Sequence, residues 1–149
     1  MNNLFSEVEK DTFKIPRKKG FLFTDGGSRG NPGIAGAGAV LYDEKKKKIA
    51  SQKMSCGIQT NNFAEYSGLI MGLELALTNG ITDLVVFMDS KLIVEQMSGN
   101  YKVKNIGLKP LFERAKSITE NFVEISFQHI PREKNKEADK LANEAMDLG

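Results

Sequence analysis

The sequence contains a single cysteine, Cys56, a single histidine, His129, and no tryptophan. One cysteine cannot form an intrachain disulfide, which fits a reducing compartment. So few cysteine and histidine residues also exclude the zinc sites that are built from several of them. Cys56 lies in an apolar, strand-like pattern, which favours the role of a small buried residue over that of a nucleophile.

Long apolar runs and strong charge of one sign are missing too. No apolar stretch is long enough to cross a membrane, and residues 1–20 are too charged for a signal peptide. We therefore expect a cytoplasmic protein without a membrane partner. The net charge of the 149 residues is only +2. Charge alone therefore does not indicate nucleic-acid binding, although a local basic face would be sufficient for it.

The length suits one domain with one core. Residues 1–19 have no clear period and end in the basic run at 16–19, so we expect a short, flexible N-terminal extension with a solvated basic end. The domain is predicted to span residues 20–149. Three strands are predicted in succession, and their short connections are typical of an antiparallel meander; they cover 21–25, 35–44 and 49–58.

After residue 60 the pattern changes to alternating helices and strands. Strands are predicted at 84–89 and 123–130, and helices at 61–80, 90–99, 107–122 and 135–148. We expect an asparagine to cap the first helix, Gly80 to end it and Asn135 to cap the last. The apolar strand at 84–89 is predicted to be buried on both faces. This order predicts an α/β fold, a mixed sheet with helices on its faces.

Four acidic residues stand where the pattern calls for apolar ones. Asp25 and Asp89 are predicted at the ends of two strands, where ligands gather in α/β sheets. Glu65 lies on a stripe of small and apolar residues, and Asp139 borders the apolar stripe of the last helix. Taken singly, the aspartates also fit turn, cap or helix-flank positions. Together the four favour a shared cation, and oxygen ligands point to Mg²⁺ or Mn²⁺.

Four motifs, in this order and at these intervals, resemble type 1 ribonuclease H: TDGGSRGNPG (24–33), TNNFAEYSGL (60–69), FMDSKLIVEQM (87–97) and NKEADKLANEA (135–145). The resemblance covers residues 21–147. It implies a five-stranded mixed sheet with three antiparallel strands first and helices on both faces. Some members carry an additional basic helix with tryptophan, whose place is taken here by residues 100–105 alone, so the form is compact.

The resemblance implies an endoribonuclease that hydrolyses the RNA strand of RNA/DNA hybrids and leaves 5′-phosphate and 3′-hydroxyl ends. The family's metal ligands fall on Asp25, Glu65, Asp89 and Asp139, which would hold two Mg²⁺ ions, with Mn²⁺ as a substitute. Asp25 would bridge the two ions, and Asp139 would be the loosest ligand. Product release would be assisted by Arg132 or His129, with Arg132 favoured because compact members use an arginine there. Double-stranded RNA is a further substrate that the resemblance allows.

The resemblance also implies which residues touch the hybrid. Glycines and a serine would let a backbone approach a ribose, asparagines would contact sugars and base edges, and a threonine would hold a DNA-strand phosphate. Basic contacts would come from lysines, including Lys102 and Lys104, so affinity should be modest and salt-sensitive. The predicted substrate-binding residues are Gly26, Gly27, Ser28, Asn31, Thr60, Asn61, Asn62 and Lys91.

Two other classes of function stay open at this stage. A non-catalytic hybrid-binding module could use the same fold, and loss of any metal ligand would favour it; all four acids are present. A resolvase or exonuclease of the same superfamily would keep the acids but would lack the glycine- and asparagine-rich motif. A monomer is expected.

Overall fold

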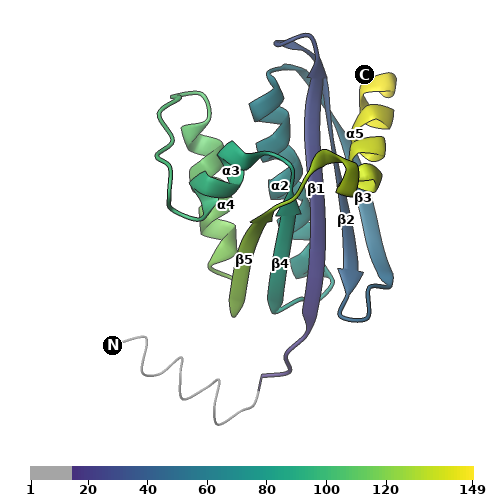
Figure 1. Cartoon of the computed structure of the whole chain (residues 1–149), viewed down its shortest axis with the longest axis vertical. Helices are drawn as coiled ribbons and strands as arrows, with labels where there is room; N and C mark the ends of the chain where they lie inside the picture. Colours follow the sequence, from purple (N-terminus) through teal and green to yellow (C-terminus); the bar gives the residue numbers. More distant parts are fainter. Residues whose placement is uncertain (1–14) are drawn as a thin grey trace.

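The structure is a computed structural model and describes residues 15–149, so most of the predicted N-terminal extension lies outside the described part. A five-stranded sheet forms the centre of the molecule, in the order β3-β2-β1-β4-β5 (Figure 1). The strands are β1 (Lys19–Arg29), β2 (Gly33–Asp43), β3 (Lys48–Gln59), β4 (Asp83–Met88) and β5 (Glu124–His129). The first three pair antiparallel, and β4 and β5 add in parallel. The predicted mixed sheet is confirmed.

Helices cover both faces of this sheet, as predicted (Figure 1). They are α2 (Asn61–Thr78), α3 (Lys91–Met97), α4 (Lys109–Thr119) and α5 (Lys136–Leu148), with a short 3-10 turn η1 (Arg132–Lys134) before the last. A Cβ atom on Gly38 of β2 would lie 2.5 Å from the Ala138 carbonyl oxygen in α5. One on Gly68 of α2 would lie 3.2 Å from the Ala37 side chain. Since successive strand residues point to opposite faces, α5 and α2 lie on opposite sides of β2.

The main core lies between the sheet and α2. Leu22 of β1, Leu41 of β2 and Val86 of β4 are fully buried there. The other face of β4 is only half-buried, at Val85 and Phe87, so the prediction of burial on both faces is wrong. The reason is that α5 packs on β1, β2 and β3 and leaves this part of the sheet partly uncovered. Within residues 15–149, no helix is both long enough and apolar enough to span a membrane.

The first strand is longer than predicted. It continues to Arg29, with Asp25 opposite Gly38 and Ser28 opposite Ala35, so Asp25 lies within the strand and not at its end. The first glycine after Asp25 has a packing role in the strand. A Cβ atom on Gly26 would lie 2.3 Å from the carbonyl carbon and oxygen of Ala64, so only glycine allows α2 to approach this closely.

Two predicted helix caps are also corrected. Thr60, not an asparagine, caps α2, and its hydroxyl oxygen accepts a hydrogen bond from the Phe63 amide at 3.2 Å. Asn135 stands at the start of α5 but makes no side-chain cap. Its amide nitrogen donates instead to the Thr24 carbonyl oxygen at 2.9 Å, which ties α5 to β1. Gly80 follows the end of α2 with a φ of +77°, as expected for its position.

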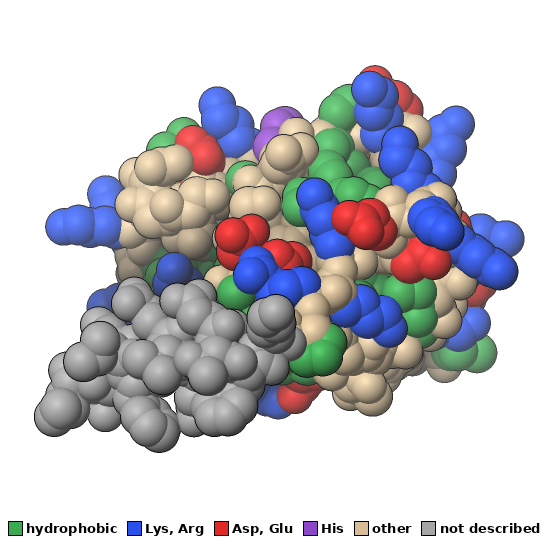
Figure 2. Space-filling view, turned by 90° about the horizontal axis from the view of Figure 1, so that it is seen from below, with side chains coloured by type: hydrophobic (Ala, Val, Ile, Leu, Met, Phe, Trp, Pro, Cys, Tyr) green, Lys and Arg blue, Asp and Glu red, His purple; other side chains and the backbone are tan. Residues whose placement is uncertain are grey.

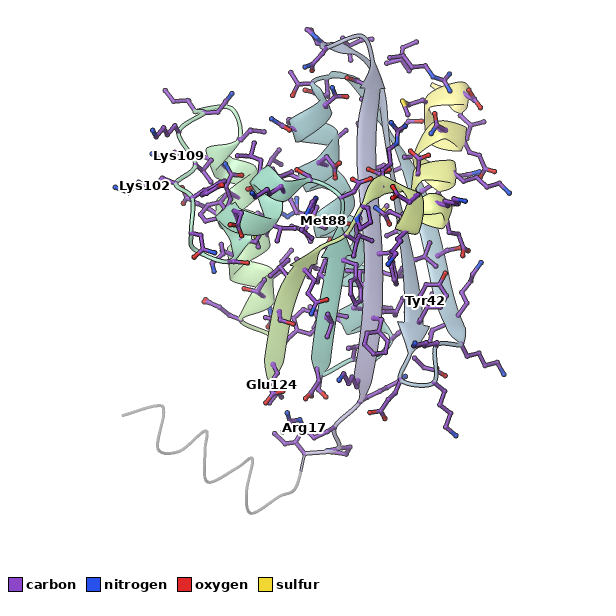
Figure 3. All side chains as sticks on the ribbon, in the orientation of Figure 1. Arg17, Tyr42, Met88, Lys102, Lys109 and Glu124 are labelled. Atoms are coloured by element: carbon purple, nitrogen blue, oxygen red, sulfur yellow. The ribbon has the colours of Figure 1, made fainter. Side chains whose placement is uncertain are left out.

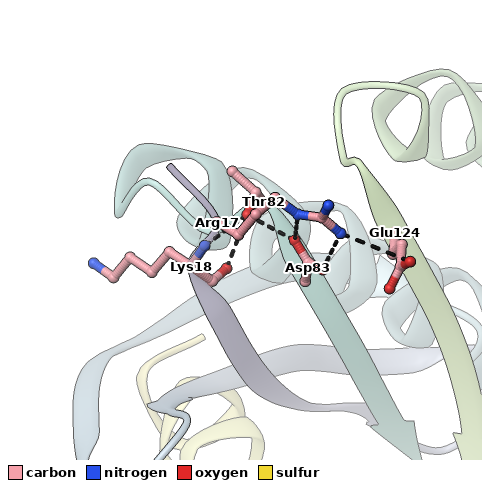
Figure 4. Close-up of polar contacts among 5 residues, drawn as sticks. All are labelled: Arg17, Lys18, Thr82, Asp83 and Glu124. Carbon is pink, nitrogen blue, oxygen red and sulfur yellow. Dashed lines mark hydrogen bonds and ion pairs between the residues drawn. The ribbon is translucent and has the colours of Figure 1, made fainter. Parts of the chain in front are cut away.

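The basic residues before β1 are exposed, as predicted, but Arg17 and Lys18 are tied to the sheet. Arg17 forms a two-point hydrogen bond with Asp83, at 2.8 and 2.5 Å, and an ion pair with Glu124 at 3.7 Å (Figure 4). The Lys18 amide donates to the Thr82 hydroxyl oxygen at 2.7 Å. The guanidinium hydrogen bonds lower the pKa of the Asp83 carboxyl. Arg17 is therefore engaged with acidic residues of the domain itself.

Candidate active site

Three of the four predicted acids come together where β4 ends beside the middle of β1. Asp25 comes from β1, Asp89 directly follows β4, and Glu65 comes from α2. Each offers a carboxylate oxygen, and these oxygens all lie within 4.8 Å of one another. The strands bring the aspartates together because β1 and β4 are parallel neighbours, with Phe23 paired to Phe87. The close approach of α2 to Gly26 places Glu65 beside them.

Burial makes this cluster unfavourable in its fully charged form. Asp25 is 6% exposed and Glu65 is 8% exposed. Burial, and next the charge of Asp89, raise the pKa of Asp25 to about 7. Burial and the charge of Asp25 raise the pKa of Glu65 well above its ordinary value, and burial raises that of Asp89. Three neighbouring carboxylates with raised pKa values call for a neutralising cation.

The residues present fit a divalent metal ion. Glu65 Oε2 is buried and has no hydrogen-bond partner among the described residues, so a buried oxygen of the cluster keeps its lone pairs free. All donor atoms here are carboxylate oxygens, the type that Mg²⁺ and Mn²⁺ prefer. Asp25, Glu65 and Asp89 would therefore hold such an ion.

The fourth predicted acid, Asp139, stands at the rim and is not part of the close group. It lies in the first turn of α5, and its Oδ1 is 3.8 Å from an Arg132 nitrogen and 3.3 Å from Asn143 Nδ2. It nevertheless contributes to raising the pKa of both Asp25 and Glu65. Asp139 is thus close enough to act on the cluster electrostatically.

A cleft of about 480 Å³ opens over these acids. Six of the predicted non-acidic site residues line it: Gly26, Gly27, Ser28, Asn61, Asn62 and Arg132. The residues that line it without having been predicted are Arg29, Ser90, Ala142, Asn143 and Met146. Of these, Asn143 could have been found, because a residue four positions after Asp139 lies on the same face of a helix.

Hydrogen bonds hold the asparagine wall of the cleft in one arrangement. Asn61 Oδ1 accepts from the Ser28 amide at 2.8 Å and from the Ser28 hydroxyl at 3.0 Å. Asn31 Oδ1 in turn accepts from the Asn61 amide at 2.9 Å. Both side-chain oxygens are thus engaged inside the protein. Asn61 lines the cleft, so its side-chain amide nitrogen is left as a donor for a ligand, whereas Asn31 supports it from outside the cleft.

Four other predicted residues do not line the cleft: Asn31, Thr60, Lys91 and His129. Of the two candidates for product release, Arg132 lines the cleft, whereas His129 Nε2 lies 3.3 Å from the Asp89 carbonyl oxygen. Lys102, in the segment between α3 and α4, projects outward at the edge of the molecule, as Lys109 of α4 does (Figure 3).

Comparison with known proteins decides the family. Residues 23–145 match the protein family described as "Reverse transcriptase-like". A ribonuclease H of Ruthia magnifica subsp. Calyptogena magnifica is 34% identical over 144 residues, which are 85% of this chain and 94% of the relative. The chain belongs to the ribonuclease H family. The predicted family, fold and nuclease class are therefore confirmed.

Two further proteins are similar to this chain. The crystal structure of LC11-RNase H1 in complex with an RNA/DNA hybrid is 46% identical, with a TM-score of 0.82, and covers 87% of this chain and 97% of that one. The bifunctional protein Rv2228c of Mycobacterium tuberculosis is 50% identical over 124 residues, 83% of this chain and 34% of the relative. The chain thus spans about a third of the length of this mycobacterial relative.

Proposed function

We propose that this ribonuclease H hydrolyses the RNA strand of RNA/DNA hybrids, using two divalent cations held by Asp25, Glu65, Asp89 and Asp139. The observation that carries the proposal is the cluster of three carboxylate oxygens within 4.8 Å, two of them from buried residues. Such a cluster destabilises a folded protein unless it binds a cation. Mg²⁺ is the proposed ion, with Mn²⁺ as a substitute.

The roles of the acids follow from their positions. Bound cations would lower the pKa of the attacking water and stabilise the leaving oxygen, giving 5′-phosphate and 3′-hydroxyl ends. Asp25 interacts with each of the other three acids, which suits it to bridge two ions. Asp139 stands at the rim, and its side chain is one-third exposed, which suits it to be the loosest ligand.

The wall of the cleft supports a nucleic-acid backbone as the ligand. Gly27 is not tightly packed, since an added Cβ atom would meet its nearest neighbours only in ordinary van der Waals contact, at 3.8 and 3.9 Å. Ser28 and Asn61 form a fixed polar edge next to it. Small residues with adjacent amide donors suit contact with ribose 2′-hydroxyls in a wide minor groove, the feature that separates RNA from DNA. That LC11-RNase H1 forms a complex with a hybrid supports the same substrate class.

Arg132 is the better candidate for helping product leave. Its side chain is 78% exposed and reaches over the cleft toward Asp139. Its charge also counteracts the rise in the pKa of Asp89, so its field reaches a second acid. The Arg132 guanidinium would pair with Asp139 in place of a metal ion, and the loss of that metal contact would weaken the binding of the product. His129 remains the alternative.

Affinity for the hybrid should be modest and should fall with salt. The net charge is only +2. Figure 2 looks at the end of the molecule where β1 begins and shows lysine and arginine side chains scattered over that face, with acidic ones between them. Binding that rests on a few phosphate contacts weakens as salt rises. A cytoplasmic monomer stays a prediction.

A cleavage panel tests the proposed function. The protein is offered labelled RNA/DNA hybrid, double-stranded RNA, single-stranded RNA and duplex DNA, each with Mg²⁺, Mn²⁺ or EDTA. We expect the RNA strand of the hybrid to be cut with either metal and not in EDTA, with 5′-phosphate ends on the products. Cleavage of double-stranded RNA would extend the substrate range. Binding of the hybrid without cleavage under any condition would favour a non-catalytic module, and cleavage of duplex DNA a different nuclease.

A further inference from the structure

Asn143 makes two contacts with a single acid of the site. It lies in α5, four residues after Asp139, and lines the same cleft. Its side-chain Nδ2 donates to the Asp139 carbonyl oxygen at 2.9 Å and lies 3.3 Å from Asp139 Oδ1. A primary amide nitrogen carries two hydrogens, so one group can hold the backbone and the carboxylate of the same residue together.

The carboxylate of Asp139 is therefore held asymmetrically. Asn143 and Arg132 both approach Oδ1, at 3.3 and 3.8 Å, and Oδ2 accepts no hydrogen bond from the described residues. A carboxylate restrained through one oxygen can turn only about that contact, so the free oxygen has a limited set of directions. The free oxygen is the atom left to reach a cation over the cluster.

The two side chains that approach Oδ1, one by a hydrogen bond and one by an ion pair, differ in how firmly they are fixed. Arg132 has a long, largely exposed side chain, and surface ion pairs of this kind are weak. Asn143 is anchored within one helix by its bond to the Asp139 carbonyl oxygen, and it can leave only by giving up that bond. Arg132 can thus depart while Asn143 keeps the carboxylate oriented.

We propose that Asn143 is a positioning residue that holds Asp139 Oδ1, so that Oδ2 faces the divalent cation of the site. The proposal rests on the function proposed above, in which Asp139 is a metal ligand. In this role Asn143 restrains Asp139, the loosest of the four ligands, as hydrogen-bond partners of metal ligands commonly do.

The alternative is that the Asn143 side chain only stabilises helix α5. A side-chain amide that bonds to the carbonyl oxygen four residues earlier can simply serve the helix. The chain offers a matched control, since Asn79 Nδ2 donates to the Leu75 carbonyl oxygen at 2.8 Å with the same four-residue spacing. Leu75 has no carboxylate, and Asn79 does not line the cleft. Asn79→Ala therefore removes the same type of helix bond without touching an acid.

The test compares wild type, Asn143→Ala and Asn79→Ala. Mn²⁺ binding is measured without nucleic acid from the EPR signal of the free ion. Hybrid binding is measured in EDTA by fluorescence anisotropy, and thermal unfolding is recorded for each protein. We expect Asn143→Ala to weaken Mn²⁺ binding by about tenfold or more, the usual cost of removing a partner of a metal ligand. Asn79→Ala should bind Mn²⁺ like wild type, and hybrid binding in EDTA should be alike in all three.

Each other outcome overturns the proposal. Wild-type Mn²⁺ affinity in Asn143→Ala shows that Asn143 does not position a ligand. Weaker hybrid binding in EDTA with unchanged Mn²⁺ affinity shows that Asn143 contacts the substrate instead. Equal loss of Mn²⁺ affinity in both variants shows a general effect on the fold. If wild type binds no Mn²⁺ and cuts no hybrid, the proposed function itself fails, a result distinct from those three.

Discussion

Asp25 and Asp89 each follow, by two residues, one member of a stacked aromatic pair. Phe23 and Phe87 are neighbours on the parallel strands β1 and β4, and their rings stack 4.7 Å apart. Residues two apart on a strand share a face, so Asp25 lies beyond Phe23 on the same side of the sheet. A charged group at the margin of an apolar layer is poorly solvated, which is why burial is the first cause of the raised pKa at both aspartates.

Stability without metal should therefore fall as pH rises. The folded-state pKa of Asp25 is about 7, against 3.8 for the ordinary carboxyl, so folding favours the protonated form. The contribution to stability is fully present below about pH 4 and is lost as the pH rises to about 7. In EDTA at pH 8, Asp25→Asn should be more stable than wild type by about 1–3 kcal/mol, since each tenfold change in an ionisation constant is worth about 1.4 kcal/mol. Urea unfolding at pH 4 and pH 8 measures this.

A control variant and a measurement with metal test this prediction further. The exposed acid Glu120 provides the control, and Glu120→Gln should follow the wild-type pH profile. Excess Mn²⁺ should reverse the order at pH 8, because a ligand that binds only the folded state stabilises wild type and not the variant. If wild type is more stable than Asp25→Asn in EDTA at pH 8, the acid cluster does not destabilise the metal-free protein and this prediction is wrong.

Metal binding should tighten as the pH rises through neutrality. A cation competes with protons for Asp25, whose pKa is about 7, and for Glu65, whose pKa is raised well above its ordinary value. We expect Mn²⁺ affinity to increase about tenfold or more between pH 6 and pH 8. Calorimetry in two buffers of different ionisation enthalpy should also detect proton release on binding at pH 7. An affinity that does not change over this range would mean that the ligands are already ionised.

Single alanine variants should separate Arg132 from His129. Arg132 lines the cleft and lies 3.8 Å from Asp139, whereas His129 does not line the cleft and its ring lies 3.3 Å from the Asp89 carbonyl oxygen. Arg132→Ala should lower the steady-state rate of hybrid cleavage about tenfold, with a smaller effect on a single turnover. His129→Ala should change either rate less than threefold, and Lys134→Ala serves as the charge control beside Arg132. Equal, near-native rates for both variants would remove the product-release role.

The adjacent glycines of β1 should respond differently to alanine. Alanine at Gly26 places its Cβ 2.3 Å from the Ala64 carbonyl group, so Gly26→Ala should destabilise the fold by about 1–3 kcal/mol and displace α2. Alanine at Gly27 has room, so Gly27→Ala should unfold like wild type but raise the KM for hybrid, because the methyl group stands where the ribose backbone approaches. Thermal unfolding and steady-state kinetics of both variants check this. An unchanged KM for Gly27→Ala would exclude close backbone contact there.

Much of the site could be predicted from the sequence because its acids conflict with their surroundings. Glu65 lies on a helix stripe of small and apolar residues, where a charged side chain destabilises the fold unless its charge is compensated. The structure places Glu65 beside Asp25, with 8% of its surface exposed. The order of strands and helices was predictable for a related reason, since hydrophobic period and short connections fix it. The four motifs then indicated the family.

The features that were wrong depend on contacts between distant segments. Gly26 looks like a turn residue in isolation, and only the packing of α2 against β1 shows why a strand contains a glycine there. Asn135 stands at a cap position, yet its amide is used by the Thr24 carbonyl oxygen 111 residues earlier in the chain. The half-exposed face of β4 likewise depends on which strands α5 packs against, which no local pattern encodes.

The most direct test of the central claim is the rate at which Asp25→Asn cleaves the RNA strand of a hybrid at saturating Mg²⁺. Asparagine keeps the shape of the side chain and removes the charge that binds and bridges the cations. Loss of several kcal/mol of metal-based stabilisation predicts a rate at least about a thousandfold below wild type, with the fold intact by circular dichroism. Near-native, Mg²⁺-dependent cleavage by Asp25→Asn would contradict the metal site and the mechanism built on it.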